Sequence, residues 1–213
     1  MNSIEIISSA IKSSITKSGI LLFLAGLMIF MGIFTSEMYF KLAFNTRDNY
    51  ISELAAPLPP NTPIEPSASI FNYTMIATGI MIIIAAFYLQ IVFKKLLTSI
   101  PTGLFGLGIL GVGIFPGYIH PWHGIFALTL FISGGFAAIS SYRIVSSPLR
   151  YVFVFLGILT LGFLIGFKYF QPLLGAGGTE RWVFYPEVFW ITGMGCYLLG
   201  IKDEYNRISH TKL

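Results

Sequence analysis

Charged side chains are scarce in this sequence. Asp, Glu, Lys and Arg make up 10% of its 213 residues, while hydrophobic residues make up 55%. A soluble domain has roughly 25% charged residues. The deficit accompanies repeated apolar runs of about 20 residues, the length at which a helix crosses a bilayer. The composition excludes an ordinary soluble domain and predicts an all-α membrane protein that crosses the bilayer several times.

Cysteine and histidine are also rare. The single cysteine, Cys196, lies inside an apolar run, so no disulfide can form within the chain. His120 and His123 are only weak candidates for metal ligands, because Pro121 separates them and no third histidine lies nearby. We therefore expect no metal centre and no haem, and the sequence indicates no other cofactor.

Six apolar runs each have roughly the length that spans a bilayer. They cover residues 18–40, 67–93, 100–119, 122–142, 149–170 and 182–201. We predict a bundle of six transmembrane helices over residues 18–201. An interfacial segment (1–17) precedes it and a tail (202–213) follows it. The connection between the first two runs, about residues 41–66, contains five prolines and is predicted to be extended or turn-like.

The positive charges are unevenly divided between the two sides of the predicted bundle. Nine of the 13 Lys and Arg residues fall on the side that holds both termini and the short connections. Short positively charged connections face the cytoplasm. We therefore expect a multi-pass protein of the plasma membrane with both termini in the cytoplasm. Because the net charge of +4 is explained by orientation, it does not indicate a nucleic-acid partner.

The unusual polar residues gather at the outer ends of the predicted spans. Ionisable groups at such a boundary are costly and usually have a partner or a function. The candidate ligand-binding residues are Glu37, Arg47, Asn72, Lys168, Glu180 and Arg181, and the candidate catalytic residues are Glu53, His123 and Glu187. Arg181 follows a glycine-rich turn, and its planar guanidinium suits a phosphate or a carboxylate. The alternative is a structural salt bridge from Arg181 to Glu53 or Glu187.

Two carboxylates lie seven residues apart, at Glu180 and Glu187. If one helix carries both, they share a face and Glu187 lies roughly 10 Å deeper. At that depth Glu187 needs a proton or a cation, and Arg181, Lys168 and Lys41 are the candidate cations. Lys41 is also four residues after Glu37, a spacing that favours a helical ion pair between those two.

His123 admits two interpretations. A histidine at the entry of a span suits general acid–base catalysis, because it titrates near neutral pH. The alternative is a hydrogen-bonded histidine that holds the outer loops together.

Several short motifs occur in order on the predicted outer side. They are Tyr50–Leu54 (YISEL), Ile70–Asn72 (IFN), Phe115-Pro116 followed by His123 and Ala127, and Gly178–Arg181 (GTER) followed by Pro186. Together they resemble the family called domain of unknown function 998, small multi-pass membrane proteins of archaea and bacteria. Ala55 stands where the family pattern has glycine. The resemblance implies six membrane helices and no assigned reaction, and a fainter likeness to eukaryotic six-span proteins of the DRAM and Sfk type suggests lipid-related work.

Two functions of different classes follow. The first is an outward-facing polar cluster that binds a lipid headgroup or another anionic ligand; whether it also hydrolyses or transfers a lipid stays open. The alternative is a non-catalytic scaffold or accessory subunit, whose glycine-lined helices pack against a membrane-protein partner or a second copy of the chain. A transporter is less expected, because the span centres hold almost no ionisable residue.

Overall fold

The structure is a computed structural model that describes residues 3–56 and 62–211. Within these residues the chain forms helices and no strand, which confirms the predicted all-α class. The elements are α1 (Ser3–Met38), η1 (Ile51–Leu54), α2 (Ser67–Phe93), α3 (Leu96–Ile114), α4 (Trp122–Ser140), η2 (Ser141–Arg143), α5 (Leu149–Ile165), α6 (Phe167–Leu174) and α7 (Ala176–Thr211).

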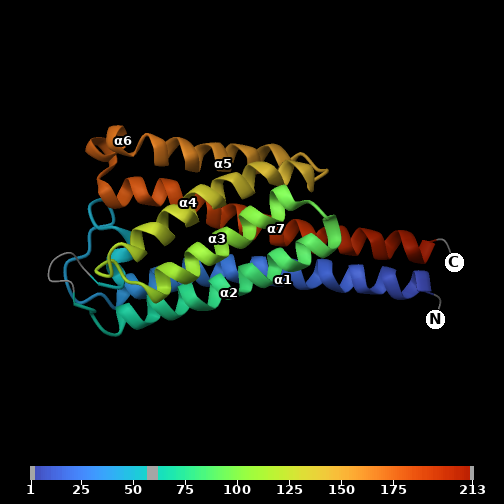
Figure 1. Ribbon diagram of the computed structural model, residues 1–213, viewed down its shortest axis with the longest axis horizontal. Coiled ribbons are helices and arrows are strands. Elements are labelled where there is room, and N and C mark those ends of the chain that lie inside the picture. The colour runs from blue at the N-terminus through green and yellow to red at the C-terminus, as the bar shows by residue number, and fades with distance from the viewer. Residues whose placement is uncertain (1–2, 57–61, 212–213) are drawn as a thin grey trace.

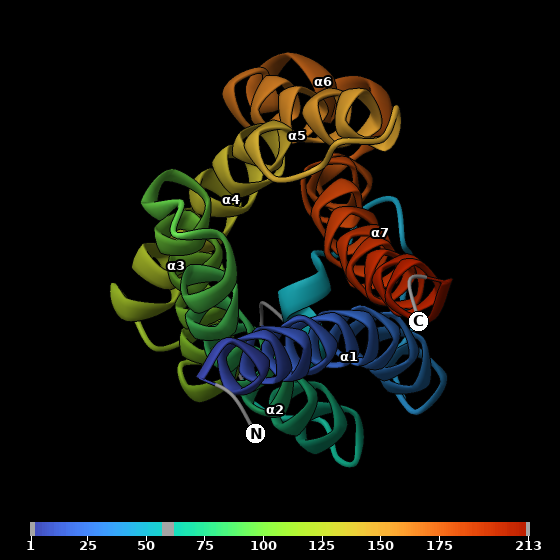
Figure 2. The same ribbon diagram turned by 90° about the vertical axis from the view of Figure 1, so that its right-hand side faces the viewer.

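The long helices lie along one common direction and form a ring (Figures 1 and 2). Each of α1 to α5 packs against its neighbour in sequence, and α7 packs between α5 and α1, which closes the ring. Both ends of the chain lie at one end of the bundle, which we call the terminal end (Figure 1). The short helices η1 and α6 lie at the opposite end, which we call the loop end.

The lengths and apolar composition of the helices support a membrane protein. Fewer helices meet these criteria for a membrane span than the six that the sequence predicts. Among the described helices, α1, α2, α3 and α4 are long and apolar enough to cross a membrane. The pair α5 and α6 becomes a fifth span if counted together, although the two helices are bent by 88°. The predicted sixth span lies in α7, which is not in this group, so six spans stay a prediction.

The observed helix ends differ from the predicted ones at three places. The first helix begins at Ser3, so no break separates the predicted interfacial segment from the first span. The fifth run is divided at Gly166 into α5 and α6. The last helix already begins at Ala176 and contains Pro186 in its interior. Pro57, Pro59 and Pro60 of the predicted proline-rich connection lie outside the described residues.

Glycines allow the helices of the ring to approach closely. A methyl group at Gly79 of α2 would meet the backbone of Leu110 in α3 at 2.6 Å. One at Gly195 of α7 would meet the backbone of Phe23 in α1 at 2.5 Å. Close backbone contact of this kind is typical of helices that associate in a membrane. These glycines therefore act in packing within the chain.

Candidate functional site

Arg181 joins the beginning of α7 to α1 and to the loop before η1. Its Nη2 forms a salt bridge with the Oε1 of Glu37 at 2.8 Å, and the side chains of Arg181 and Glu37 are only 11% and 22% exposed. Its Nη1 donates to the backbone carbonyls of Thr46, Asn49 and Gly177 at 2.8, 3.1 and 3.0 Å. Because these interactions involve three separate segments, Arg181 holds the loop end together.

This network corrects two predictions about ion pairs. Arg181 pairs with Glu37, and neither Glu53 nor Glu187 is its partner. The reason is that α1 packs against α7, so that the last turn of α1 lies beside the first turns of α7. The predicted pair between Glu37 and Lys41 does not form, because α1 ends at Met38 and Lys41 is exposed beyond it.

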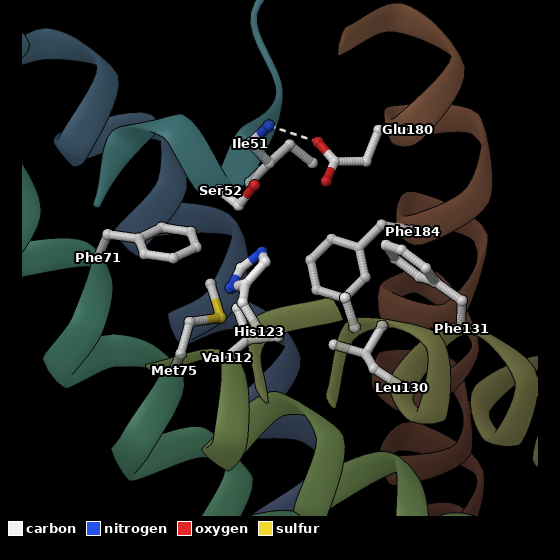
Figure 3. A pocket seen from close by; sticks show the side chains of 11 residues that line it. Ile51, Ser52, Phe71, Met75, Val112, His123, Leu130, Phe131, Glu180 and Phe184 are labelled. Carbon is white, nitrogen blue, oxygen red and sulfur yellow. Dashed lines mark hydrogen bonds between the residues drawn. The ribbon is translucent and has the colours of Figure 1, made fainter. Parts of the chain in front are cut away.

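A small cavity lies inside the ring at the loop end, and we call it the inner cavity. Its volume is about 30 Å³, which holds about one or two water molecules. Side chains of η1, α2, α3, α4 and α7 line it, and most are apolar (Figure 3). Its polar lining groups are Ser52, His123 and Glu180. Three polar side chains from three separate elements therefore face one small space.

Glu180 connects the inner cavity to η1. Its carboxylate accepts a hydrogen bond from the backbone N–H of Ile51 (Figure 3). The pKa of Glu180 is raised to about 7, mainly by desolvation inside the bundle and to a lesser extent by the negative charge of Glu53, while the Ile51 N–H and Arg181 oppose the shift. Glu180, which precedes the predicted sixth span, is therefore suited to exchange a proton near neutral pH.

His123 presents a basic nitrogen to the same cavity. Its Nδ1 lies 2.8 Å from the backbone carbonyl oxygen of Phe115. A carbonyl only accepts hydrogen bonds, so Nδ1 carries the proton and Nε2 is left as an acceptor. This hydrogen bond ties the ring to the α3–α4 connection and leaves Nε2 unprotonated, while the acid–base interpretation stays a prediction.

The candidate metal site is not supported. His120 is exposed in the connection before α4 and does not line the cavity beside His123. Across residues 3–56 and 62–211, no group of three or more His, Cys, Asp or Glu side chains is arranged to hold a metal ion.

Both carboxylate oxygens of Glu53 accept hydrogen bonds from the loop that precedes η1. One oxygen accepts from the side-chain amide of Asn49 at 2.7 Å, and the other from the backbone N–H of Tyr50 at 3.1 Å. The side chain is buried and does not line the inner cavity. These contacts close the first turn of η1, which places Ile51 and Ser52 over the cavity.

Glu187 lies deeper in the ring and is fully buried. It shares one continuous helix with Glu180, which meets the condition under which the two carboxylates were expected to share a face. Neither carboxyl oxygen has a hydrogen-bond partner of normal geometry in the described part of the chain. The predicted cations, Arg181, Lys168 and Lys41, do not pair with it.

A larger hollow, which we call the outer groove, lies between α5 and α7 at the loop end. Its volume is about 460 Å³. The apolar wall consists of Leu156, Leu159, Trp182, Tyr185, Pro186 and Phe189, and the polar end consists of Thr46, Arg47, Gly178 and Arg181. The side chain of Arg47 is exposed and forms no hydrogen bond or ion pair with any residue that the structure describes. The groove therefore has a free positive charge at one end of an apolar surface.

The two remaining candidates lie outside both hollows. Lys168 is exposed on α6 and does not line the outer groove. Asn72 lies on α2, where its side-chain oxygen is buried without a hydrogen-bond partner in the described chain. Sequence reasoning missed Ser52 as a lining residue, although it lies within the motif Tyr50–Leu54.

The separate motifs that suggested a family meet at the inner cavity. Its lining includes Ser52, Phe71, His123, Ala127 and Glu180, which come from each of the four motifs. No curated protein and no solved structure matches the chain. The model of the family described as protein of unknown function (DUF998) matches residues 23–197, so the chain belongs to the DUF998 family.

Proposed function

We propose that the protein is a six-span plasma-membrane protein that binds a phospholipid in the outer groove. The loop end faces outward and both termini are cytoplasmic. The lipid phosphate lies at Arg47, and an acyl chain lies along α5 and α7. The observation that carries this proposal is the apolar groove with an unpaired arginine at its polar end.

The shape and chemistry of the groove suit such a ligand. Small-molecule sites are typically hollows of roughly 300–1,000 Å³ with mostly apolar walls and a few polar groups that fix orientation. The outer groove, at about 460 Å³, has this composition. Trp182 and Tyr185 belong to its wall, and such side chains prefer the membrane interface, where lipid headgroups lie. These residues support a phospholipid that enters the groove from the side.

Arg47 and Arg181 contribute differently to this site. The charge of Arg181 is already paired with Glu37, and its Nη1 is occupied by backbone carbonyls. Arg181 therefore shapes the polar end by fixing the backbone on either side of Arg47. Arg47 retains all of its donors, and an arginine can contact a phosphate through two parallel hydrogen bonds.

Binding without turnover is the function that the groove supports. The candidate catalytic residues Glu53, His123 and Glu187 do not line it. His123 and Glu187 lie inside the ring, on the opposite side of α7 from the groove. We therefore propose no hydrolysis or transfer at the bound lipid.

Native mass spectrometry of the purified protein with added dioleoylphosphatidylglycerol tests the proposal. The wild type should retain one lipid, and Arg47→Ala should weaken binding about tenfold, because a charged hydrogen bond contributes roughly 1.5–3 kcal/mol. Lys168→Ala is the matched control, since it removes an exposed lysine near the groove but outside its lining. Equal retention by Arg47→Ala and wild type would overturn the proposal.

Two further outcomes separate the alternatives. Glycerol phosphate at the same concentration should displace little lipid, because it lacks the acyl chain; complete displacement would indicate a site for a free anion. A mass that shows a second polypeptide and no lipid would favour the scaffold function instead.

A further inference from the structure

We propose that Glu187 is a proton-binding site inside the ring, and that it is loaded from the loop end through the inner cavity by way of His123 and Glu180. This inference rests on the inner face of α7 and is independent of lipid binding in the outer groove.

The surroundings of Glu187 require a proton. A buried carboxylate is tolerated only with a cation or several hydrogen bonds, because desolvation of the charge is costly. Glu187 is fully buried, and neither oxygen has a hydrogen-bond partner of normal geometry among the described residues. Its carboxyl group lies against Gly134 of α4, where Phe105 of α3 also packs, and the backbone N–H of Gly135 acts on it; none of these residues titrates. An ionisable residue at such a position is a functional candidate in a membrane protein.

The inner cavity contains two groups that can accept and release a proton. Glu180 contributes a carboxylate and His123 contributes its Nε2. The other charged or titratable groups that act on Glu180 are Glu53 in η1, Tyr50 just before it, and Arg181 and Tyr185 on α7. The cavity holds about one or two water molecules, which would connect the groups in it.

One apolar layer separates the inner cavity from Glu187. Leu130, Phe131 and Phe184 form the inner wall of the cavity (Figure 3). The rings of Phe131 and Phe184 contact each other edge to face, with centroids 6.3 Å apart. Phe184 precedes Glu187 by three residues on α7, and Leu130 precedes Gly134 by four on α4. The layer is therefore about one helical turn thick, and rotation of Phe184 would open it.

The transfer itself is a simple proton exchange. A hydronium ion that enters the cavity from the loop end gives a proton to the Glu180 carboxylate or to Nε2 of His123 and becomes water. The O–H or N–H bond so formed then breaks as an O–H bond forms at Glu187, either directly or through water. The donor returns to its initial state, and Glu187 becomes a neutral carboxylic acid. No electron transfer and no further reactant is involved.

Infrared spectroscopy of the full chain in lipid tests whether Glu187 holds a proton. The carbonyl-stretch band of protonated carboxylic acids should be clearly smaller in Glu187→Gln, which keeps the shape of the side chain, than in the wild type, and the remaining band should come from Glu180. Asp48→Asn is the control, because it removes an exposed carboxylate of the loop and should leave the band unchanged. A band of equal size in Glu187→Gln and wild type would overturn the proposal.

The rate at which this band shifts in D₂O tests the path. The shift should be at least about tenfold slower in the double variant His123→Ala with Glu180→Gln, since acid–base groups speed proton transfer by roughly 10²–10⁴-fold. Phe184→Ala should accelerate it, because the apolar layer is removed. An unchanged rate in the double variant would show that the proton does not pass through the inner cavity. Circular dichroism of each variant confirms that the fold is retained.

Discussion

The two faces of α7 differ in the carboxylates that they carry and in the exposure of their aromatic side chains. The face toward the ring contains Glu180 and Glu187, and it buries Phe184 and Trp190 almost completely. The face toward α5 and the outer groove contains Trp182 and Phe189, which are 48% and 54% exposed. Both carboxylates thus point inward, whereas the aromatic side chains that face the groove are exposed. Although α7 closes the ring between α1 and α5, it falls outside the set of helices that are long and apolar enough to cross a membrane.

Alanine substitutions of the adjacent residues Phe189 and Trp190 should show the largest difference in stability between the two faces of α7. Trp190→Ala should lower the free energy of unfolding by about 4 kcal/mol, because a fully buried aromatic side chain is removed. The indole stacks edge to face on Phe105 and donates to Ser141 at 2.9 Å, so its loss also leaves the Ser141 hydroxyl without this donor. Phe189→Ala should cost less than about 1 kcal/mol, as expected for an exposed position. Unfolding by SDS in mixed micelles measures both.

Similar losses for the two variants would contradict the assignment of faces. They would show that the outer face of α7 is covered by another chain, which is the arrangement expected for a scaffold subunit.

The salt bridge between Arg181 and Glu37, at the loop end of α7, gives the next largest expected effect on stability. Arg181→Ala should lower the free energy of unfolding by about 3 kcal/mol, because it leaves the poorly exposed Glu37 without its partner. Glu37→Ala should cost less, since Arg181 keeps its three backbone acceptors. A double-mutant cycle isolates the pair, and the second substitution should cost little once the first is made. Additive losses would mean that the pair contributes nothing of its own.

Much of this arrangement could be predicted from the sequence. The apolar runs predicted all-helical structure, and α2 covers the predicted residues 67–93. The seven-residue spacing indicated that Glu180 and Glu187 would share a face if one helix carried both, and α7 does carry both. The polar residues expected at the outer ends indeed gather at the loop end. These predictions succeed because a helix in a membrane is specified by its own residues.

Contacts between distant segments could not be predicted in the same way. The choice of Glu37 as the partner of Arg181 depends on α1 lying beside α7, which no local pattern encodes. The bend between α5 and α6 was missed, because the run 149–170 is apolar on both sides of Gly166. The inner cavity and the outer groove arise from tertiary packing. Sequence therefore indicated the groups at the site but not which of them share a cavity.

The pH dependence of stability tests whether the inner face holds a titrating carboxyl group. The pKa of Glu180 is raised from 4.5 to about 7 in the folded protein. The folded state therefore binds more protons than the unfolded state between these values, and stability falls as pH rises from about 4.5 to about 7. The shift corresponds to roughly 3 kcal/mol at most. Glu180→Gln should flatten this part of the profile, and an identical profile in both proteins would exclude Glu180 as its source.

Gly134 gives the smallest effect and the closest test of how the inner face holds Glu187. A methyl group at this position would overlap the Glu187 carboxyl and approach Phe105 at 2.7 Å, so Gly134→Ala should cost about 2 kcal/mol through overpacking. In a Glu187→Ala background the same substitution should cost clearly less, because the carboxyl is gone. Gly162→Ala is the control, since nothing lies within 4 Å of the added methyl group and helix propensity favours alanine. Equal losses at Gly134 with and without the carboxyl would show that the added methyl group clashes with Phe105 of α3 alone, and that Glu187 is free to turn away from α4.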